Sequence, residues 1–480
     1  MKGFWSLTST ISLTLSILFL FGYNYEDVSA LHTTHLCRPE QRDALLQFNN
    51  EFEVLNSSYA YDYCIYKGIK PHRKTESWMN NSDCCNWEGI TCNAKSGEVI
   101  GLDLSCSYLG GRFHSNSSLQ NLHSLTTLDL SRNGISGQIM SSIRNLSHLT
   151  SLDLSENNFS ESIPSSIVDL SYLTFLDLSF NSFLGQIPSS IGNLSHLTYL
   201  NLFYNQISGQ IPSSIGNLYN LTYLDLSFNN FVGKIPSSFG YLNQLTSLYV
   251  GGNKLNGRFP IALLNLTELS SLKLYYNQFA GTIPHNITSL SKLTNFLASY
   301  NAFTGTLPSS LFTIPSIEYV RLSDNQLNGI LEFGNISSPP KLRTLDVRNN
   351  NLRGSIPATL SKFTTLVELY LSNYKTQGPV DFSIFSHLKL LQDLDLSYLN
   401  TTTAIDLNDF LSYFKRLERL VLSGNHVTAT NKSSVSGPPL LRYMELSGCG
   451  ITEFPEFPRT QNMLSLDISN NKIKGQVPGW

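Results

Sequence analysis

The stretch LTYLNLFYNQISGQIPSSIGNLYNLTYLDLSFN (197–229) decides the fold, because it contains one pattern twice. The pattern is L-x-x-L-x-L-x-x-N, and its closing asparagines, Asn205 and Asn229, lie 24 residues apart. Working outward from this stretch, asparagine recurs at the same spacing at positions 133, 157, 181, 253, 277, 301 and 325. The phase continues less strictly through Asn350, Asn425 and Asn471, and imperfect copies place Ser107, Tyr374, Leu399 and Cys449 there. Sixteen copies, twelve of them with asparagine, indicate a repeat array.

Alternation within each copy predicts a short β-strand. In LDL (224–226) the two leucines point to one side and the aspartate to the other. One such strand cannot bury its leucines alone, whereas stacked copies bury them against each other in a continuous core. We therefore expect a parallel sheet along the concave side of a curved solenoid. Each closing asparagine is expected to turn inward, where its amide bonds the backbone of its own and the adjacent coil.

The other half of each coil follows the pattern G-x-I-P-S-S-I-G-N-L, as at Gly185 and Gly209. Related copies start at Gly233, Gly257, Gly281, Gly305, Gly354 and Gly475. Glycine permits a tight bend, and proline then fixes φ and prevents a long regular helix. We expect short strands or 3₁₀ turns here.

The N-terminus indicates export. Lys2, an apolar run at 11–21 and small residues at 28–30 are typical of a signal peptide over residues 1–30. A retained signal anchor is the alternative, although the run is short for a span of about 20 residues. Six of the seven cysteines cluster in the first quarter, which in an exported chain indicates three disulfides. Their spacing alone leaves all fifteen connectivities open.

Twelve N-x-S/T sequons predict a heavily glycosylated surface. They lie at Asn56, Asn80, Asn116, Asn145, Asn158, Asn193, Asn220, Asn265, Asn286, Asn335, Asn400 and Asn431. The formal net charge of -3 does not favour nucleic-acid binding. No catalytic, phosphate-binding or metal-ligand motif is present, so we expect no enzyme, no cofactor and no metal site.

The repeats resemble the plant-specific class of extracellular leucine-rich repeats. The segments CRPEQRDALLQFNNEF (37–52), SWMNNSDCCNWEGITC (77–92) and VIGLDLSCSYLGGRFHSNSSL (99–119) resemble the start of plant receptor-like proteins of the disease-resistance type. The resemblance implies an α/β-type repeat solenoid, a curved right-handed leucine-rich-repeat superhelix with a parallel concave β-sheet and a disulfide-capped N-terminal domain. It also implies three disulfide pairs, which are Cys37–Cys84, Cys85–Cys92 and Cys64–Cys106.

The expected domains are a signal peptide (1–30), a cysteine-rich cap (31–98) and about sixteen repeats (99–480), irregular at 374–449. Members of this family continue with more repeats, a C-terminal cap, a membrane helix and a short cytosolic tail. This sequence stops at GQVPGW (475–480), part-way through a coil, so we expect a form shortened before the membrane helix. Family resemblance then favours the outer face of the plasma membrane for the longer form, and secretion into the apoplast for a genuine short form.

The implied function is extracellular ligand recognition in plant defence and innate immunity, together with a partner kinase. Expected partners are a protein, peptide or glycan ligand and a receptor-kinase co-receptor, but no nucleic acid. One alternative is a secreted inhibitor of microbial pectinases, which shares the cap and repeat but is shorter and ends in a cysteine cap. Another is the ectodomain of a receptor kinase, which requires a downstream kinase domain.

Aromatic residues gather at the positions expected to face solvent on the concave sheet, which lie six, four, two and one residues before each asparagine. Contiguous exposed aromatics usually mark a contact surface, although they also suit β-strands for structural reasons alone. The predicted ligand-binding residues are Phe175, Phe180, Tyr199, Phe203, Tyr204, Tyr223, Phe228, Tyr249, Lys273, Tyr275, Tyr276, Tyr300, Tyr319 and Arg321, with Arg348 nearby.

Three further features favour structural roles. Asp129, Asp153, Asp177 and Asp225 recur at repeat spacing, and we interpret them as a solvated acidic face in preference to a cation site. Cys449 is expected to replace a closing asparagine and not to serve as a reactive thiol. The segment TTTAIDLNDFLSYF (401–414) predicts a longer helical stretch.

Overall fold

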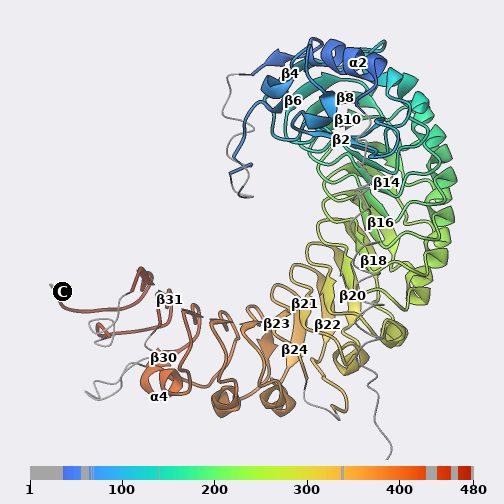
Figure 1. Cartoon of the computed structure of the whole chain (residues 1–480). Helices are drawn as coiled ribbons and strands as arrows, with labels where there is room; N and C mark the ends of the chain where they lie inside the picture. The colour runs from blue at the N-terminus through green and yellow to red at the C-terminus, as the bar shows by residue number, and fades with distance from the viewer. Residues whose placement is uncertain are drawn as a thin grey trace, which may run out of the picture.

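The structure is a computed structural model that describes residues 36–476, apart from 56–63, 66–67, 69, 140, 337–339, 429–439 and 456–462. The predicted signal peptide and the sequons at Asn56 and Asn431 lie outside the described residues. The described chain forms a curved arc of stacked coils, with a sheet on the inner side and short helices on the outer side (Figure 1). Neighbouring coils share one continuous apolar interior, as the repeat predicts.

The concave sheet consists of parallel strands that follow one another in chain order. Leu176, Leu200 and Leu224 pair directly across three successive strands, so the 24-residue period becomes an in-register stack. Among the described residues this sheet contains β3 (Val99–Asp103), β5 (Thr127–Asp129), β7 (Ser151–Asp153), β9 (Phe175–Asp177), β11 (Tyr199–Asn201), β13 (Tyr223–Asp225), β15 (Ser247–Tyr249), β17 (Ser271–Lys273), β19 (Asn295–Leu297), β21 (Tyr319–Arg321), β23 (Thr344–Asp346), β25 (Glu368–Tyr370), β27 (Asp393–Asp395), β29 (Arg419–Val421), β31 (Tyr443–Glu445) and β32 (Ser465–Asp467). The short strand β2 (Ile90–Cys92) pairs antiparallel with β3 at the N-terminal edge.

A second set of strands forms the outer sheets on one flank of the solenoid. The first of these contains β1 (Glu53–Val54), β4 (Leu109–Arg112), β6 (Gly134–Gly137), β8 (Asn158–Ser162) and β10 (Ser182–Leu184). The second contains β12 (Ser208–Gln210), β14 (Asn230–Gly233), β16 (Lys254–Arg258), β18 (Gln278–Gly281), β20 (Ala302–Thr306), β22 (Gln326–Gly329), β24 (Asn351–Gly354) and β26 (Lys375–Thr376). A separate pair, β28 (Ile405–Asp406) and β30 (Val427–Thr428), follows later in the chain.

Short 3₁₀ helices cover the convex side, where the G-x-I-P segments predicted short strands or 3₁₀ turns. They are η3 (Ser118–Asn121), η4 (Ser141–Asn145), η5 (Ser165–Asp169), η6 (Ser189–Asn193), η7 (Ser213–Asn217), η8 (Ser237–Tyr241), η9 (Ile261–Asn265), η10 (His285–Ser289), η11 (Ser309–Thr313), η12 (Ala358–Lys362) and η13 (Phe382–His387). In a typical coil Gly209 adopts a φ of 80°, and Pro212 directly precedes η7. The left-handed glycine turns the chain, and in the coils with the G-x-I-P pattern proline supplies the extended residue before the helical turn.

Closing asparagines connect the coils beneath the concave sheet. The Asn181 amide donates to the carbonyls of Leu154 in the preceding coil and of Leu178 and Ser179 in its own, at 2.9, 3.3 and 3.1 Å. Its Oδ1 accepts the N–H of Phe159 at 2.9 Å. The same arrangement recurs at Asn205 and Asn229. The inward-turned amide ladder predicted from the sequence is therefore confirmed.

Imperfect copies fill the asparagine position in different ways. Cys449 is buried, and its Sγ lies 3.3 Å from the Leu422 carbonyl, so it occupies the ladder position as expected. Leu399 and Tyr374 are also buried there, and the tyrosine hydroxyl donates to the Arg353 carbonyl at 3.1 Å. Strand pairing continues unbroken through the irregular segment 374–449. The helix expected in 401–414 is present as α4 (Leu407–Ser412), which Asp406 caps at its N-terminus.

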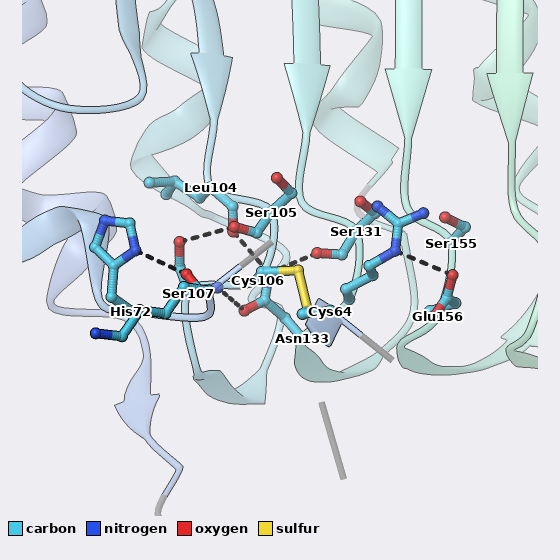
Figure 2. Close-up of a disulfide and its surroundings, with 12 residues drawn as sticks. Cys64, His72, Leu104, Ser105, Cys106, Ser107, Ser131, Asn133, Ser155 and Glu156 are labelled. Carbon is cyan, nitrogen blue, oxygen red and sulfur yellow. Dashed lines mark hydrogen bonds and ion pairs between the residues drawn. A yellow bond between two sulfur atoms is a disulfide. The ribbon is translucent and has the colours of Figure 1, made fainter. Parts of the chain in front are cut away.

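The N-terminal cap covers the first coil. Helix α2 (Pro39–Asn49) buries Leu45 and Phe48, and the short turns η1 (Lys74–Ser77) and η2 (Cys84–Asn86) bring Trp78 onto Trp87 with their rings 5.4 Å apart. Disulfides join Cys37 to Cys84, Cys85 to Cys92 and Cys64 to Cys106, the same pairs that the family resemblance implies. Figure 2 shows the Cys64–Cys106 bridge beside Asn133, where it ties the cap insertion to the first rung of the ladder.

Candidate ligand-binding surface

A first row of aromatic rings lies across strands β9, β11, β13 and β15. Phe175 and Tyr199 stack with centroids 4.4 Å apart, and Tyr199 and Tyr223 stack at 4.5 Å. Tyr249 meets Tyr223 edge-on at 5.4 Å. Phe175, Tyr199 and Tyr223 pair directly at equivalent strand positions in successive coils, so the in-register pairing itself stacks these three rings. Tyr249 lies two residues further along its strand, opposite Asp225. We call these four residues the first aromatic row.

A second aromatic row lies in the turns that follow strands β9, β11, β13, β17 and β19. Its members are Phe180, Phe203, Tyr204, Phe228, Tyr275, Tyr276 and Tyr300, connected by centroid distances from 4.2 to 6.4 Å. The shortest of these distances joins Tyr276 and Tyr300, which stack in parallel. Tyr204 and Tyr276 are 57% and 51% exposed. The second row therefore contains more accessible aromatic side chains than the first row, whose four members are half-buried.

Five members of the second row adopt left-handed backbone conformations. The φ angles of Phe180, Tyr204, Phe228, Tyr276 and Tyr300 lie between 49° and 55°. This conformation is rare for bulky residues, because the β-carbon approaches the following carbonyl at a cost of about 1–2 kcal/mol. The turn that brings the following asparagine inward requires this left-handed conformation. The same turn directs the side chain of the left-handed aromatic residue outward.

Not every position expected to face solvent does so. Aspartates four residues before asparagine are buried at Asp177 and Asp225, and serines two residues before it are buried at Ser179 and Ser227. The expectation of a solvated acidic face is therefore wrong for these two aspartates. Each carboxylate accepts the N–H of the serine two residues later, at 2.9 and 2.8 Å, and so closes the turn at the strand end.

Burial of these tyrosine and aspartate side chains changes their pKa values. Burial and the nearby Asp177 carboxylate raise the pKa of Tyr199, and burial and Asp225 raise the pKa of Tyr223. Burial also raises the pKa of Asp225. Burial, with Asp129 and Asp177 on either side, raises the pKa of Asp153 to about 7. Both tyrosine hydroxyls therefore stay neutral and serve as hydrogen-bond donors and acceptors.

Basic residues expected near the aromatic rows are engaged with other side chains. Lys273 Nζ lies 3.8 Å from the centroid of the Tyr249 ring, which places a cation at the edge of the first aromatic row. Arg321 pairs with Glu368 at 2.8 Å, and Arg348 lies over the Tyr370 ring and beside Asp346. The structure thus brings eleven aromatics and Lys273 together. Tyr319 and Arg321 lie further along the sheet, outside both rows.

Other candidates have structural partners. His148 and His196 place Nδ1 at 3.0 and 2.9 Å from backbone carbonyls 25 residues earlier, consistent with equivalent roles in the repeat. The ten sequon asparagines within the described residues are all exposed. The sequence did not indicate the left-handed aromatics or the aspartate turns, although the D-x-S motif that closes several strands, as at Asp129, Asp153, Asp177 and Asp225, is a usable signal for the turns.

Comparison with known families agrees with this architecture. A leucine-rich-repeat region model matches residues 176–434, a leucine-rich-repeat model matches 123–183, and a leucine-rich-repeat N-terminal domain model matches 38–60 and 63–93. The chain belongs to the leucine-rich-repeat family. Within the described residues, no helix has the length and apolar character needed to cross a membrane.

The curated proteins to which this chain is similar include plant receptor-like proteins. Receptor-like protein 33 of Arabidopsis thaliana is 70% identical over 98% of this chain and 51% of its own length. Receptor-like protein 53 of the same plant is 66% identical over 100% of this chain and 55% of its own length. The chain therefore spans about half the length of these relatives.

A solved structure with the same fold is the Arabidopsis receptor kinase HAESA in complex with the peptide hormone IDA and the co-receptor SERK1. Its TM-score is 0.76 at 31% sequence identity, covering 90% of this chain and 70% of that chain. This leucine-rich-repeat neighbour holds a peptide hormone and a co-receptor in its complex.

Proposed function

We propose that this chain is the extracellular ligand-recognition region of a plant cell-surface receptor-like protein that acts in defence perception with a partner kinase. The observation that carries the proposal is the pair of aromatic rows on one concave face. Exposed aromatic clusters on a rigid scaffold mark contact surfaces, because large rings bury much area at low entropic cost. The similar curated relatives described above are receptor-like proteins, which supports the receptor assignment.

The ligand-binding residues in this proposal are the two aromatic rows and Lys273. Rows on either side of the strand ends provide two parallel lines of contact, and the neutral tyrosine hydroxyls add hydrogen-bonding groups between them. A protein or peptide ligand running along the solenoid would contact several coils at once. Its role is non-catalytic binding at the outer cell surface, and a co-receptor kinase would transmit the signal, as the co-receptor in the HAESA complex suggests.

The test compares binding by the secreted chain and a double variant, Tyr204→Ala with Tyr276→Ala. The probes are low-molecular-weight peptide fractions from plant apoplastic fluid and from microbial culture filtrates, with retained peptides quantified by mass spectrometry. Peptides retained by the unmodified chain should be lost from the variant, while secretion stays unchanged. A matched control is Tyr172→Ala with Tyr241→Ala, which removes two tyrosines that are 55% and 63% exposed elsewhere.

Equal retention by the double variant would remove the concave aromatic rows as the ligand site. A panel of microbial pectinases tests the alternative of a secreted inhibitor. Strong inhibition by the chain, abolished by the same double variant, would replace the receptor proposal with an inhibitor function for this face.

A further inference from the structure

The outer sheet has a charge distribution unlike that of the concave face. Lys234, Lys254 and Arg258 are exposed on or beside strands β14 and β16. The outer-sheet segments of six consecutive coils (182–189, 206–213, 230–237, 254–261, 278–285 and 302–309) contain no aspartate or glutamate. We call the exposed side chains of Gln186, Gln210, Lys234, Lys254, Asn256 and Arg258 the basic strip.

The three cations of the basic strip have no carboxylate partner among the described residues. Lys254 Nζ donates to the Asn230 side-chain oxygen at 3.0 Å, which leaves its charge uncompensated. On the concave face, by contrast, Arg321, Arg348 and Arg419 each form ion pairs with acidic side chains. Uncompensated cations on one flank produce a local positive potential in a chain whose formal net charge is -3.

Four side chains of the strip, those of Gln186, Gln210, Lys234 and Arg258, lie in register because each crosses the glycine of the next coil. A β-carbon on Gly209 would stand 2.8 Å from Cγ of Gln186, and one on Gly257 would stand 3.0 Å from Cγ of Lys234. Arg258 lies in the same way beside Gly281. Glycine therefore leaves the space in which these side chains extend along the solenoid, so their polar ends form an ordered line.

A groove of about 930 Å³ runs along this line. Gln186, Gln210, Lys234 and Asn256 supply polar groups to it, and the isoleucines and prolines of the G-x-I-P segments form its floor. None of the strands from β10 to β26 contains a sequon. The sequons at Asn193, Asn220 and Asn265 fall on or just after the 3₁₀ helices, whereas Asn158 lies on β8, which pairs with β10 at one end of the groove. None of the residues that line the groove from Gln186 to Asn256 is therefore a predicted glycan attachment site.

We propose that the basic strip binds a linear polysaccharide that carries carboxylate groups. Amide and hydroxyl groups in the groove suit sugar hydroxyls, and the three cations suit carboxylates. Protein partners usually anchor on aromatic side chains, but the aromatic residues of these segments, such as Phe183 and Phe231, are buried. An extended peptide presents side chains on one face every ~6.7 Å, whereas the coils of the strip repeat every ~4.8 Å, the spacing of paired strands. The side chains of an extended peptide therefore do not match the repeat of the strip.

This proposal is independent of the ligand assigned to the concave face. Its test measures binding of the secreted chain to a defined oligogalacturonate at low ionic strength by calorimetry. The fully methyl-esterified oligomer, which has no carboxylates, and poly-glutamate, which has no sugar, are the comparison probes. Affinity for the acidic oligomer should exceed that for either comparison probe at least tenfold and should fall as salt is added.

A triple variant, Lys234→Gln with Lys254→Gln and Arg258→Gln, should weaken binding of the acidic oligomer at least tenfold. The control triple, Lys95→Gln with Lys292→Gln and Lys415→Gln, changes the net charge equally at exposed sites elsewhere and should leave affinity unchanged. A further variant, Val232→Thr, creates a sequon at Asn230 without altering any charge. Its glycan should block binding, and enzymatic removal of the glycan should restore it.

Three outcomes would overturn the proposal. They are no measurable binding of the acidic oligomer at low ionic strength, an equal loss in the control triple, and poly-glutamate binding as tightly as the oligomer. The last outcome would indicate that the strip takes an acidic protein partner instead.

Discussion

Asn201 donates a 2.9 Å hydrogen bond from Nδ2 to Oδ2 of Asp177 on the neighbouring strand. Its own Oδ1 accepts the N–H of Phe203 at 3.0 Å, the same turn-closing bond that aspartate makes in other coils. Asparagine at this position therefore preserves the turn, removes one negative charge and adds a donor toward the adjacent carboxylate. Asn201 thus shows, within this chain, how one of the recurring strand-end aspartates can be replaced by a neutral residue.

The substitution Asp153→Asn should stabilise the chain at neutral and alkaline pH. The folded-state pKa of Asp153 is raised to about 7 from the ordinary value of 3.8, so between these values the folded state binds more protons than the unfolded state. Stability of the unmodified chain therefore falls as pH rises through this window. We expect a gain of about 1–3 kcal/mol for the variant at pH 8, discounted for partial exposure, that vanishes near pH 4.

Thermal unfolding of the secreted chain across this pH range checks the prediction. The control is Asp169→Asn, an exposed aspartate in η5, which should show no such pH dependence. If Asp153→Asn lowered the stability of the chain at pH 8, the interactions made by the carboxylate would outweigh the cost of burying its charge.

Removal of a ladder amide should destabilise the array. Asn181→Ala removes the Oδ1 that accepts the Phe159 N–H, so this buried donor loses its partner. The carbonyls of Leu154, Leu178 and Ser179 each lose one donor but keep another, from Asn157, Asn205 and Glu156. An unpaired buried polar group costs about 1–3 kcal/mol where water cannot replace the partner, so we expect a loss of about 1–3 kcal/mol. Denaturant titration with Asn217→Ala, an exposed asparagine in η7, as the control measures this difference.

Cys449 should be inert in the folded chain. Its side chain is buried, and burial raises the pKa of its thiol, so little thiolate is present for reaction. We expect iodoacetamide to modify it only after denaturation. Intact-mass measurement follows the modification. Rapid modification of the native chain would contradict the ladder assignment. Cys449→Asn should fold with unchanged or higher stability, because an amide can donate to the same two carbonyls, whereas Cys449→Ala should lose stability.

Loss of the Cys64–Cys106 bridge should loosen the cap without dissolving the coils beyond it. The double variant Cys64→Ser with Cys106→Ser releases a loop with a sequence separation of 42, and such a bridge typically contributes about 2–4 kcal/mol. Hydrogen exchange should rise in residues 64–112 and stay unchanged in the coils after 200, because contacts are nearest-neighbour. Uniform exchange across the chain would indicate global destabilisation instead. Peptide mapping of the unmodified chain without reduction checks the three pairings.

The repeat period made the architecture predictable. Leucine alternation and the spacing of Asn133 to Asn325 specify the strands, their register and the ladder, because each is a local consequence of one repeated pattern. The position of Cys449 in the ladder followed from the same phase. Family resemblance, and not spacing, implied the disulfide pairs.

Side-chain exposure on the concave face was less predictable. Alternation places Asp177 and Tyr199 on the same side of the sheet, but the Asp177 carboxylate accepts hydrogen bonds from Tyr199 and Asn201 of the next coil, which no single copy reveals. The outward direction of Tyr204 depends on a left-handed turn that the following asparagine imposes. The line formed by Gln210 and Lys234 depends on contact with glycines one coil away, which the sequence of one coil does not disclose.

The ladder has a consequence for how such chains change length. Asn181 bonds residues 27 and 22 positions before it in the preceding coil, in addition to the carbonyls of its own coil. Deleting or duplicating one unit of 24 residues returns the same partners to the same places, and the join is indistinguishable from any other. A unit of another length, such as the 26 residues from Leu399 to Asn425, needs extra chain to be absorbed on the convex side, where α4 lies. We therefore expect gain or loss of a whole coil to move surface residues along the arc while preserving the contacts of the interior.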